Sequence, residues 1–170
     1  MPKGLKSTSS VVSIGFSVTE SGANTFTQSA VDLNLDPLNR EVFVVMAIDM
    51  DPLAPDVTAG TNTATSASLT TTSQTGVQNL SNSNCMANAQ LVIRMGAGSV
   101  EGVPFTRQAK ESPSALLEYL GIIATNDFFV QVKGTGNSNA KGLSGKLYGY
   151  RAQASADIYA ALVQSEVLSA

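Results

Sequence analysis

The sequence contains no histidine, no tryptophan and one cysteine, and only 14% of its residues are charged. Histidine is the side chain best suited to acid–base catalysis near neutral pH, and histidine and cysteine are the usual ligands of zinc. Their scarcity predicts a protein that is not an enzyme. Because Cys85 has no second cysteine to pair with in the chain, synthesis in a reducing cytoplasm is the simplest expectation, with the thiol acting as a small buried side chain.

Long apolar runs and clustered basic residues are also missing. The longest apolar run, residues 42–48, is far shorter than the roughly 20 residues that cross a bilayer, and the serine-rich residues 7–13 do not suit a secretory signal. The net charge is −3 and the ten lysines and arginines are scattered, which argues against direct nucleic-acid binding. We expect one domain over residues 1–170, without membrane contact.

The most unusual segment carries no charge at all from Val57 to Ile93 and consists largely of Thr, Ser, Ala, Asn and Gly. We predict a long neutral polar loop over residues 57–88 that is ordered by contact with neighbours and could contain a short strand near 67–72. Such a loop can lie against neighbouring copies with little desolvation of charge. Thr70, Thr71 and Thr72 are therefore predicted to be interface residues.

Strand patterns dominate the remainder. Residues 11–19 alternate, as in a half-buried strand, whereas Glu41 to Met50 is a continuous apolar run typical of a strand buried on both faces. Asp-Pro pairs at 36–37 and 51–52 are expected to end that strand. Further strands are predicted at 89–95, 128–133 and 146–154. The last two are expected to pair across a Gly/Asn/Ser-rich link, with the Tyr148 and Tyr150 face of the second strand turned inward.

Two segments have helical signals. Residues 112–121 combine a serine cap, proline at the first helical position and a final glycine, which predicts a short helix. Residues 157–168 place apolar side chains on one helical face, although an alanine-rich strand is also compatible with the pattern. The fold class predicted from these patterns is mainly β, a single β-sandwich with a jelly-roll-like topology and one or two short helices.

The clearest candidate for chemistry is Asp49-x-Asp51 followed by Asp56. Carboxylates two apart on a strand share a face and could hold a hard cation, Ca²⁺ or Mg²⁺, in a structural role. Aspartate beside proline is also common for reasons of turn geometry alone, so strand termination is the competing interpretation. No EF-hand pattern is present. We expect no cofactor beyond this possible structural cation.

Other short motifs do not support catalysis. Ser138 and Lys141 have the spacing of a serine acylase pair but lie in a Gly/Asn/Ser-rich link, and residues 142–146 lack the full phosphate-loop pattern. Asn79 begins a glycosylation sequon. The four tyrosines lie in the C-terminal third, where they could fill a core, stack on a sugar or anchor a subunit contact. Tyr159 is the tyrosine that we predict at an interface.

The strands at Val42–Asp51, Leu91–Met95, Phe128–Val132 and Leu147–Ala154, joined by long polar loops, resemble the β-sandwich capsid and decoration proteins of viruses and phages in style of construction. The resemblance implies a structural subunit of a virion shell, synthesised in the host cytoplasm and located in the virion. It would bind copies of itself and other virion proteins. The N-terminal arm, residues 1–10, and the C-terminal segment, residues 155–170, are expected to dock. A carbohydrate- or receptor-binding β-sandwich module is the alternative.

Overall fold

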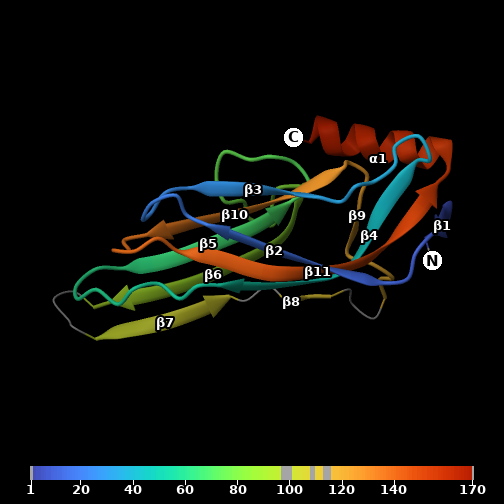
Figure 1. Ribbon diagram of the computed structural model, residues 1–170. Helices are drawn as coiled ribbons and strands as arrows, with labels where there is room; N and C mark the ends of the chain where they lie inside the picture. Colours follow the sequence, from blue (N-terminus) through green and yellow to red (C-terminus); the bar gives the residue numbers. More distant parts are fainter. Residues whose placement is uncertain (1, 97–100, 108–109, 113–115, 170) are drawn as a thin grey trace.

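The computed structural model describes residues 2–96, 101–107, 110–112 and 116–169, and it consists of two β-sheets and one helix (Figure 1). The elements, in chain order, are β1 (Leu5–Ser7), β2 (Val12–Thr19), β3 (Thr27–Asp32), β4 (Glu41–Pro52), β5 (Thr63–Thr70), β6 (Cys85–Met95), β7 (Gly102–Arg107), β8 (Lys110–Glu111), β9 (Gly121–Ile123), β10 (Asp127–Thr135), β11 (Gly142–Ala154) and α1 (Ala156–Leu168).

The order of the strands is that of a jelly roll. In the first sheet β2 pairs with β11, β11 with β4 and β4 with β9, while in the second the order is β3, β10, β5, β6 and β7. All of these pairs are antiparallel. Successive strands alternate between the two sheets from β2 to β5 and from β9 to β11, whereas β5, β6 and β7 are consecutive neighbours in the second sheet. The predicted β-sandwich and its jelly-roll topology are confirmed.

Strand β4 has a core on each of its faces, as its continuous apolar sequence predicts. Phe43 and Val45 lie in the core between the sheets, whereas Val42 and Val44 lie in a second core on the outer side. The register between β4 and β11 shifts at Met46, which has no partner on β11. Because of this β-bulge, odd-numbered residues point into the inner core before Met46 and even-numbered residues do so after it. Ile48 and Met50 continue the inner core beyond it.

Two glycines of β11 make room for aromatic rings in the inner core. A Cβ atom at Gly145 would lie 2.6 Å from the ring of Phe16, and one at Gly149 would lie 2.4 Å from the ring of Phe43. Phe16 also meets Phe128 of the opposite sheet edge to face, with ring centroids 6.0 Å apart. These glycines let large side chains from β2 and β4 cross beneath β11 and reach the other sheet.

Helix α1 confirms the helical interpretation of residues 157–168, and it covers the outer core at one end of the first sheet (Figure 1). The side chains of Ile158, Tyr159, Leu162 and Val163 pack there against the outer faces of β4 and β11. Ala152 and Ala154 belong to this outer core, and Tyr150 is half-buried against it. The prediction that the Tyr148 and Tyr150 face of β11 turns inward is therefore wrong: Tyr150 packs against the outer core, and Tyr148 lines a hollow with Asp49 and Lys146.

The predicted hairpin of residues 128–133 and 146–154 is wrong. Strand β10 pairs with β3 and β5, whereas β11 pairs with β1, β2 and β4, so the two strands belong to different sheets. Their link crosses from one sheet to the other. The predicted end of β4 at Asp51-Pro52 is confirmed, because the strand ends at Pro52, which is opposite Leu143.

The predicted helix at 112–121 is wrong in the part that can be compared. Residues 113–115 lie outside the described residues, but 116–120 form turns and bends, and Gly121 begins β9. The exposed edge of β4 accounts for this: Leu120 N–H donates to Val45 O, and β9 continues that pairing. Pairing with an open strand outweighs local helix propensity. A Cβ at Gly121 would also lie 2.7 Å from the methyl carbon of Met86.

The neutral segment is not the long loop predicted for residues 57–88. It forms β5, a central strand of the second sheet, and continues into β6, which starts at Cys85. Six of the eight β5 side chains, among them Thr63 and Thr70, are no more than 1% exposed. The short strand predicted within it near 67–72 overlaps β5, although β5 starts earlier and is longer.

Candidate functional site

The neutral segment is fastened to its own sheet by a row of polar side chains. Gln28, Gln131, Ser68 and Asn88 stand opposite one another on β3, β10, β5 and β6, and we call these four residues the polar row. Gln131 is fully buried at its centre. It accepts a hydrogen bond from Ser68 Oγ at 2.7 Å, and its Nε2 donates to Gln28 Oε1 at 3.0 Å.

The polar row holds the loop of residues 71–84 over the outer face of the second sheet. The backbone N–H of Gln74 donates to Gln28 Oε1 at 2.8 Å, and that of Gln78 donates to Ser68 Oγ at 3.0 Å. Asn88 Nδ2 donates to Gln78 O at 2.6 Å. Because the donors and acceptors match, the loop is ordered by contacts within the chain.

The predicted interface threonines lie inside this arrangement. Thr70 is fully buried, and its hydroxyl donates to Thr72 O and accepts from Gln131 Nε2, both at 2.7 Å. Thr71 is 6% exposed. The hydroxyl of Thr72 accepts from Asn84 Nδ2 at 2.8 Å. Thr70 and Thr71 are thus unavailable to a neighbouring copy in this conformation, because their side chains are covered by their own chain.

The chain termini also dock on their own subunit. Leu5 of β1 is opposite Ala154 of β11 and is buried in the outer core. A Cβ at Gly4, whose φ is +79°, would lie 2.1 Å from Ile158 of α1, so the arm passes close to the helix. Both terminal segments therefore help to close one end of the sandwich.

The surface of α1 is unusually apolar and poor in charge. Only Asp157 and Glu166 are charged on the helix, and Glu166 is its one buried side chain. Val167 is 60% exposed and Leu168 is 75% exposed. A surface helix normally turns charged residues outward and apolar residues inward. This helix has the reverse distribution at its C-terminal end.

A hollow of about 390 Å³ beside α1 is lined mainly by apolar groups. Leu35, Pro37, Tyr159 and Val163 contribute to it, and the adjoining Leu38 is 92% exposed. Tyr159, Val163 and Val167 are four residues apart, so they form a stripe on the helix. We call these residues the α1 surface: Leu35, Pro37, Leu38, Tyr159, Val163 and Val167. Of the four predicted interface residues, Tyr159 belongs to it.

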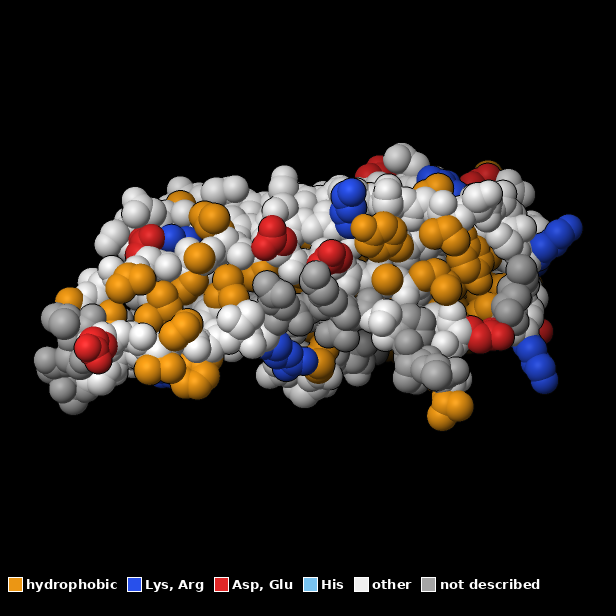
Figure 2. Space-filling view, turned by 90° about the horizontal axis from the view of Figure 1, so that it is seen from below, with side chains coloured by type: hydrophobic (Ala, Val, Ile, Leu, Met, Phe, Trp, Pro, Cys, Tyr) orange, Lys and Arg blue, Asp and Glu red, His pale blue; other side chains and the backbone are white. Residues whose placement is uncertain are grey.

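The opposite end of the molecule carries a second exposed apolar area. Every described residue of β7 is exposed, and Val103 and Phe105 are each 57% exposed. Leu53 and Val57 are also exposed, by 56% and 73%. Figure 2 shows hydrophobic side chains gathered toward both ends of one face, with acidic and basic side chains between them.

The three predicted cation ligands have different surroundings. Asp49 and Asp51 share the outer face of β4, opposite Lys146 and Ser144 of β11. Asp56 instead forms an ion pair with Lys141 at 2.5 Å and accepts hydrogen bonds from the backbone of Ser138 and Asn139. In the described part of the chain, no group of three or more acidic, histidine or cysteine side chains is placed to hold a metal ion. The cation stays a prediction.

Asp56 acts as an anchor for the loop that connects the two sheets. The Lys141 ammonium, together with the two backbone donors of the loop, lowers the pKa of Asp56 from 3.8 to about 2. Asn137 reinforces the anchor, because its Oδ1 accepts from Asp56 N–H and its Nδ2 donates to Ala64 O, both at 2.8 Å. The lysine of the Ser138 and Lys141 motif is thus occupied by Asp56, and its role is structural.

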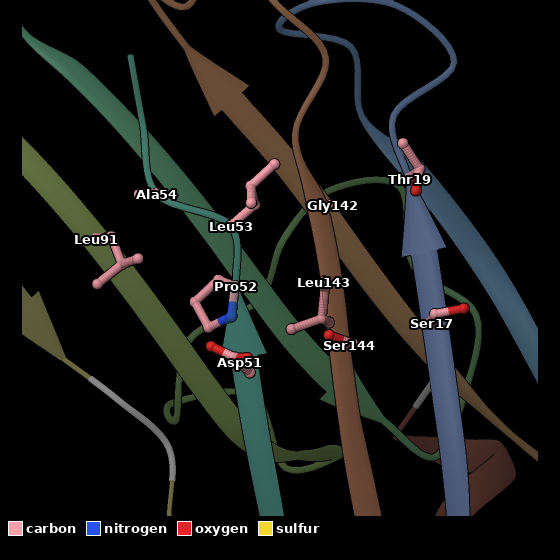
Figure 3. Close-up of a pocket in the computed structure, with 10 residues that line it drawn as sticks. All are labelled: Ser17, Thr19, Asp51, Pro52, Leu53, Ala54, Leu91, Gly142, Leu143 and Ser144. Carbon is pink, nitrogen blue, oxygen red and sulfur yellow. The ribbon is translucent and has the colours of Figure 1, made fainter. Parts of the chain in front are cut away.

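Two adjoining hollows lie at the first sheet, and one of them also reaches Leu91 of β6 in the second sheet. One, of about 520 Å³, lies where β2, β4 and β11 meet, and Figure 3 shows Leu53, Leu91 and Leu143 around it. The other, of about 570 Å³, is lined by Asp49, Lys146 and Tyr148. Asp51 and Ser144 line both hollows. This face combines an aromatic ring, carboxylates, an ammonium group and hydroxyls.

Comparisons with known proteins give a similarity of fold only. No protein-family model matches the chain, and no curated protein matches it in sequence. A solved chain from desmodium yellow mottle tymovirus is 12% identical, with a TM-score of 0.32, over 92% of this chain and 95% of that one. One from turnip yellow mosaic virus is also 12% identical, with a TM-score of 0.31, over 82% and 93%. In the described residues, no helix is long and apolar enough to cross a membrane.

Proposed function

We propose that this chain is a structural subunit of a virion shell, a capsid or capsid-decorating protein, that assembles with copies of itself. The observation that carries the proposal is the α1 surface, a nearly uncharged apolar area on the outside of a jelly roll. The jelly roll is an architecture that viral capsid proteins use, although lectins use it as well, so the fold supports the proposal by analogy.

The α1 surface suits a second copy of the chain for physical reasons. A helix that is apolar on its outer as well as its inner side is stable in water only at a cost, which burial against another molecule removes. The exposed area of β7 at the far end offers a separate apolar contact. A subunit with contacts at two ends can join more than one neighbour, which a closed shell requires.

Size-exclusion chromatography with light scattering tests the proposal, together with electron microscopy of the assembled material. Leu38→Lys places a charge on the α1 surface at a residue that is 92% exposed, so folding should be unaffected. We expect this variant to raise the concentration needed for assembly at least about tenfold, equivalent to about 1.4 kcal/mol per contact. The control is Val11→Lys, the same kind of change at a residue that is 62% exposed and belongs to neither apolar area, and this variant should assemble like the unaltered chain.

Two results would count against assembly through this surface. A stable monomer at high micromolar concentration, with no particles on the grid, would remove the proposal altogether. Equal assembly by the Leu38→Lys variant and the unaltered chain would show that contacts between copies do not involve the α1 surface.

A carbohydrate-binding module is the second candidate, and the hollow beside Tyr148 favours it. Sugars are bound by an aromatic face next to carboxylates and hydrogen-bond donors, and Tyr148, Asp49 and Lys146 provide these groups. A glycan array would test this function. Binding that is lost in Tyr148→Ala would support it, and absence of binding to every glycan would reject it.

A further inference from the structure

Glu166 has the least favourable position of any acidic side chain on α1. It is 7% exposed, although glutamate is rarely buried without a partner of opposite charge. It also lies in the last turn of the helix, where the helix dipole disfavours a negative charge, and no basic residue occupies that turn. Among the described residues, no lysine or arginine forms an ion pair with it.

The carboxylate joins α1 to the segment that follows β9. Its Oε1 accepts from the backbone N–H of Ala124, and its Oε2 accepts from that of Thr125, both at 3.0 Å. Asn84 Nδ2 approaches the Glu166 carbonyl oxygen at 3.5 Å. These contacts tie the C-terminal half of the helix to two separate segments of the sandwich.

We propose that Glu166 is a pH-sensitive latch, which holds the C-terminal half of α1 against the sandwich more firmly when its carboxyl group is protonated. The negative charge is costly here because the site is buried, lacks a counter-ion and lies at the negative end of the helix dipole. The neutral acid removes this cost and keeps one oxygen to accept a backbone N–H.

The titration of Glu166 has the direction that this arrangement requires. Burial raises the pKa of Glu166 above its ordinary value, and the hydrogen bonds from Ala124 and Thr125 oppose the shift only in part. No charged neighbour contributes. Among the described residues that line the hollow beside Glu166, the other titratable side chain is that of Cys85.

The sign of the pH dependence follows from this shift. A group whose pKa is higher in the docked state favours docking at low pH, and the gain is lost as the pH rises through the docked pKa. Each unit of difference between the docked and undocked pKa values changes the docking equilibrium up to tenfold. The latch does not depend on the proposed function, although any assembly through the α1 surface would share its pH range.

Hydrogen exchange of the full chain, corrected for the intrinsic effect of pH, tests the latch at about pH 7.5 and about pH 5. We expect the protection of residues 160–168 to rise about two- to tenfold at the lower pH. Glu166→Gln, which mimics the neutral acid, should show high protection at both values. Asp157→Asn removes the exposed acid of the same helix and should keep the pH dependence.

Two outcomes would overturn the latch. Protection of α1 in the unaltered chain could be unchanged or lower at the acidic pH, a result that does not depend on whether any variant folds. Alternatively, Glu166→Gln could retain the full pH dependence, which would assign the titration to another group. Both readouts are made at concentrations where the chain is monomeric, so a failure of assembly would not affect them.

Discussion

The central strands of the two sheets are buried to a similar extent by opposite kinds of side chain. Strand β4 is buried by Val, Phe, Ile and Met on both faces, whereas β5 reads Thr-Ala-Thr-Ser-Ala-Ser-Leu-Thr. Apolar burial stabilises β4 in proportion to the area removed from water. The outer face of β5 is instead covered by a loop whose amides match its hydroxyls. A strand with few large apolar side chains can therefore be central when the hydroxyls of its outer face are paired.

The difference predicts that β4 is damaged by loss of volume and β5 by loss of hydrogen bonds. The largest effect is expected from Phe43→Ala in β4, where the ring is 1% exposed. Removing it leaves a cavity in the inner core and should lower the free energy of unfolding by about 3–5 kcal/mol. Urea denaturation would measure this. A loss below about 1 kcal/mol would mean that the core collapses to fill the space.

The corresponding change at the polar row is Gln131→Met, which keeps the length of the side chain but removes its amide. Ser68, Thr70 and Gln28 then each lose a buried partner. Because unpaired buried polar groups are costly, we expect a loss of about 2–3 kcal/mol. The loop of residues 71–84 should also become sensitive to proteases. An unchanged stability would contradict the role given to the polar row.

Adjacent threonines offer a matched comparison of smaller effect. Thr70 and Thr71 are both buried, but the Thr71 hydroxyl is without a hydrogen-bond partner among the described residues, whereas that of Thr70 has two. Thr70→Val should cost about 1–2 kcal/mol, while Thr71→Val should be neutral or stabilising within about 1 kcal/mol. Thermal unfolding of the two variants measures the difference. Equal losses would show that the hydrogen bonds of Thr70 do not matter.

The smallest effect is expected at the loop that connects the two sheets. This loop is held by the ion pair between Asp56 and Lys141, and not by apolar burial as in β4 or by buried hydrogen bonds as in β5. The pKa of Asp56 is lowered to about 2, so the stability that it contributes is present above the ordinary value of 3.8 and is lost as the pH falls toward 2. Asp56→Asn should flatten the pH dependence of the melting temperature in that range. A variant with the same acid sensitivity as the unaltered chain would exclude Asp56 as the anchor.

Much of the fold could be predicted from local patterns, and the failures have a common cause. The continuous apolar run of β4 and the alternating pattern of β2 each predict a strand, because each pattern reflects which faces of the strand are buried. The full extent of strand β5 was not predicted, because hydroxyl-rich sequences form loops as well as strands. The strand is favoured here by Gln131 on β10, which forms hydrogen bonds with Ser68 and Thr70 and is distant in sequence. The helical signals at 112–121 were overridden by the open edge of β4, which no local pattern reveals.

The predicted site residues have different surroundings. Tyr159 lies on the α1 surface, where a contact between copies stays a proposal, whereas Thr70 and Thr71 are covered by their own loop. Asp49 and Asp51 do share a face, as their spacing predicts. Asp56 has a separate role because Lys141 reaches it from a distant part of the chain. Glu166 was not singled out, since its burial arises only when α1 docks.

Hydrogen exchange of residues 63–84 in the dilute, monomeric chain tests most directly whether the charge-free segment is ordered by its own subunit. The backbone amides of Gln74 and Gln78 should be protected, because they donate to Gln28 and Ser68 within the chain. Their protection should not change with protein concentration. Amides that exchange freely in the monomer and become protected only on assembly would contradict this account, and would show that neighbouring copies order the segment.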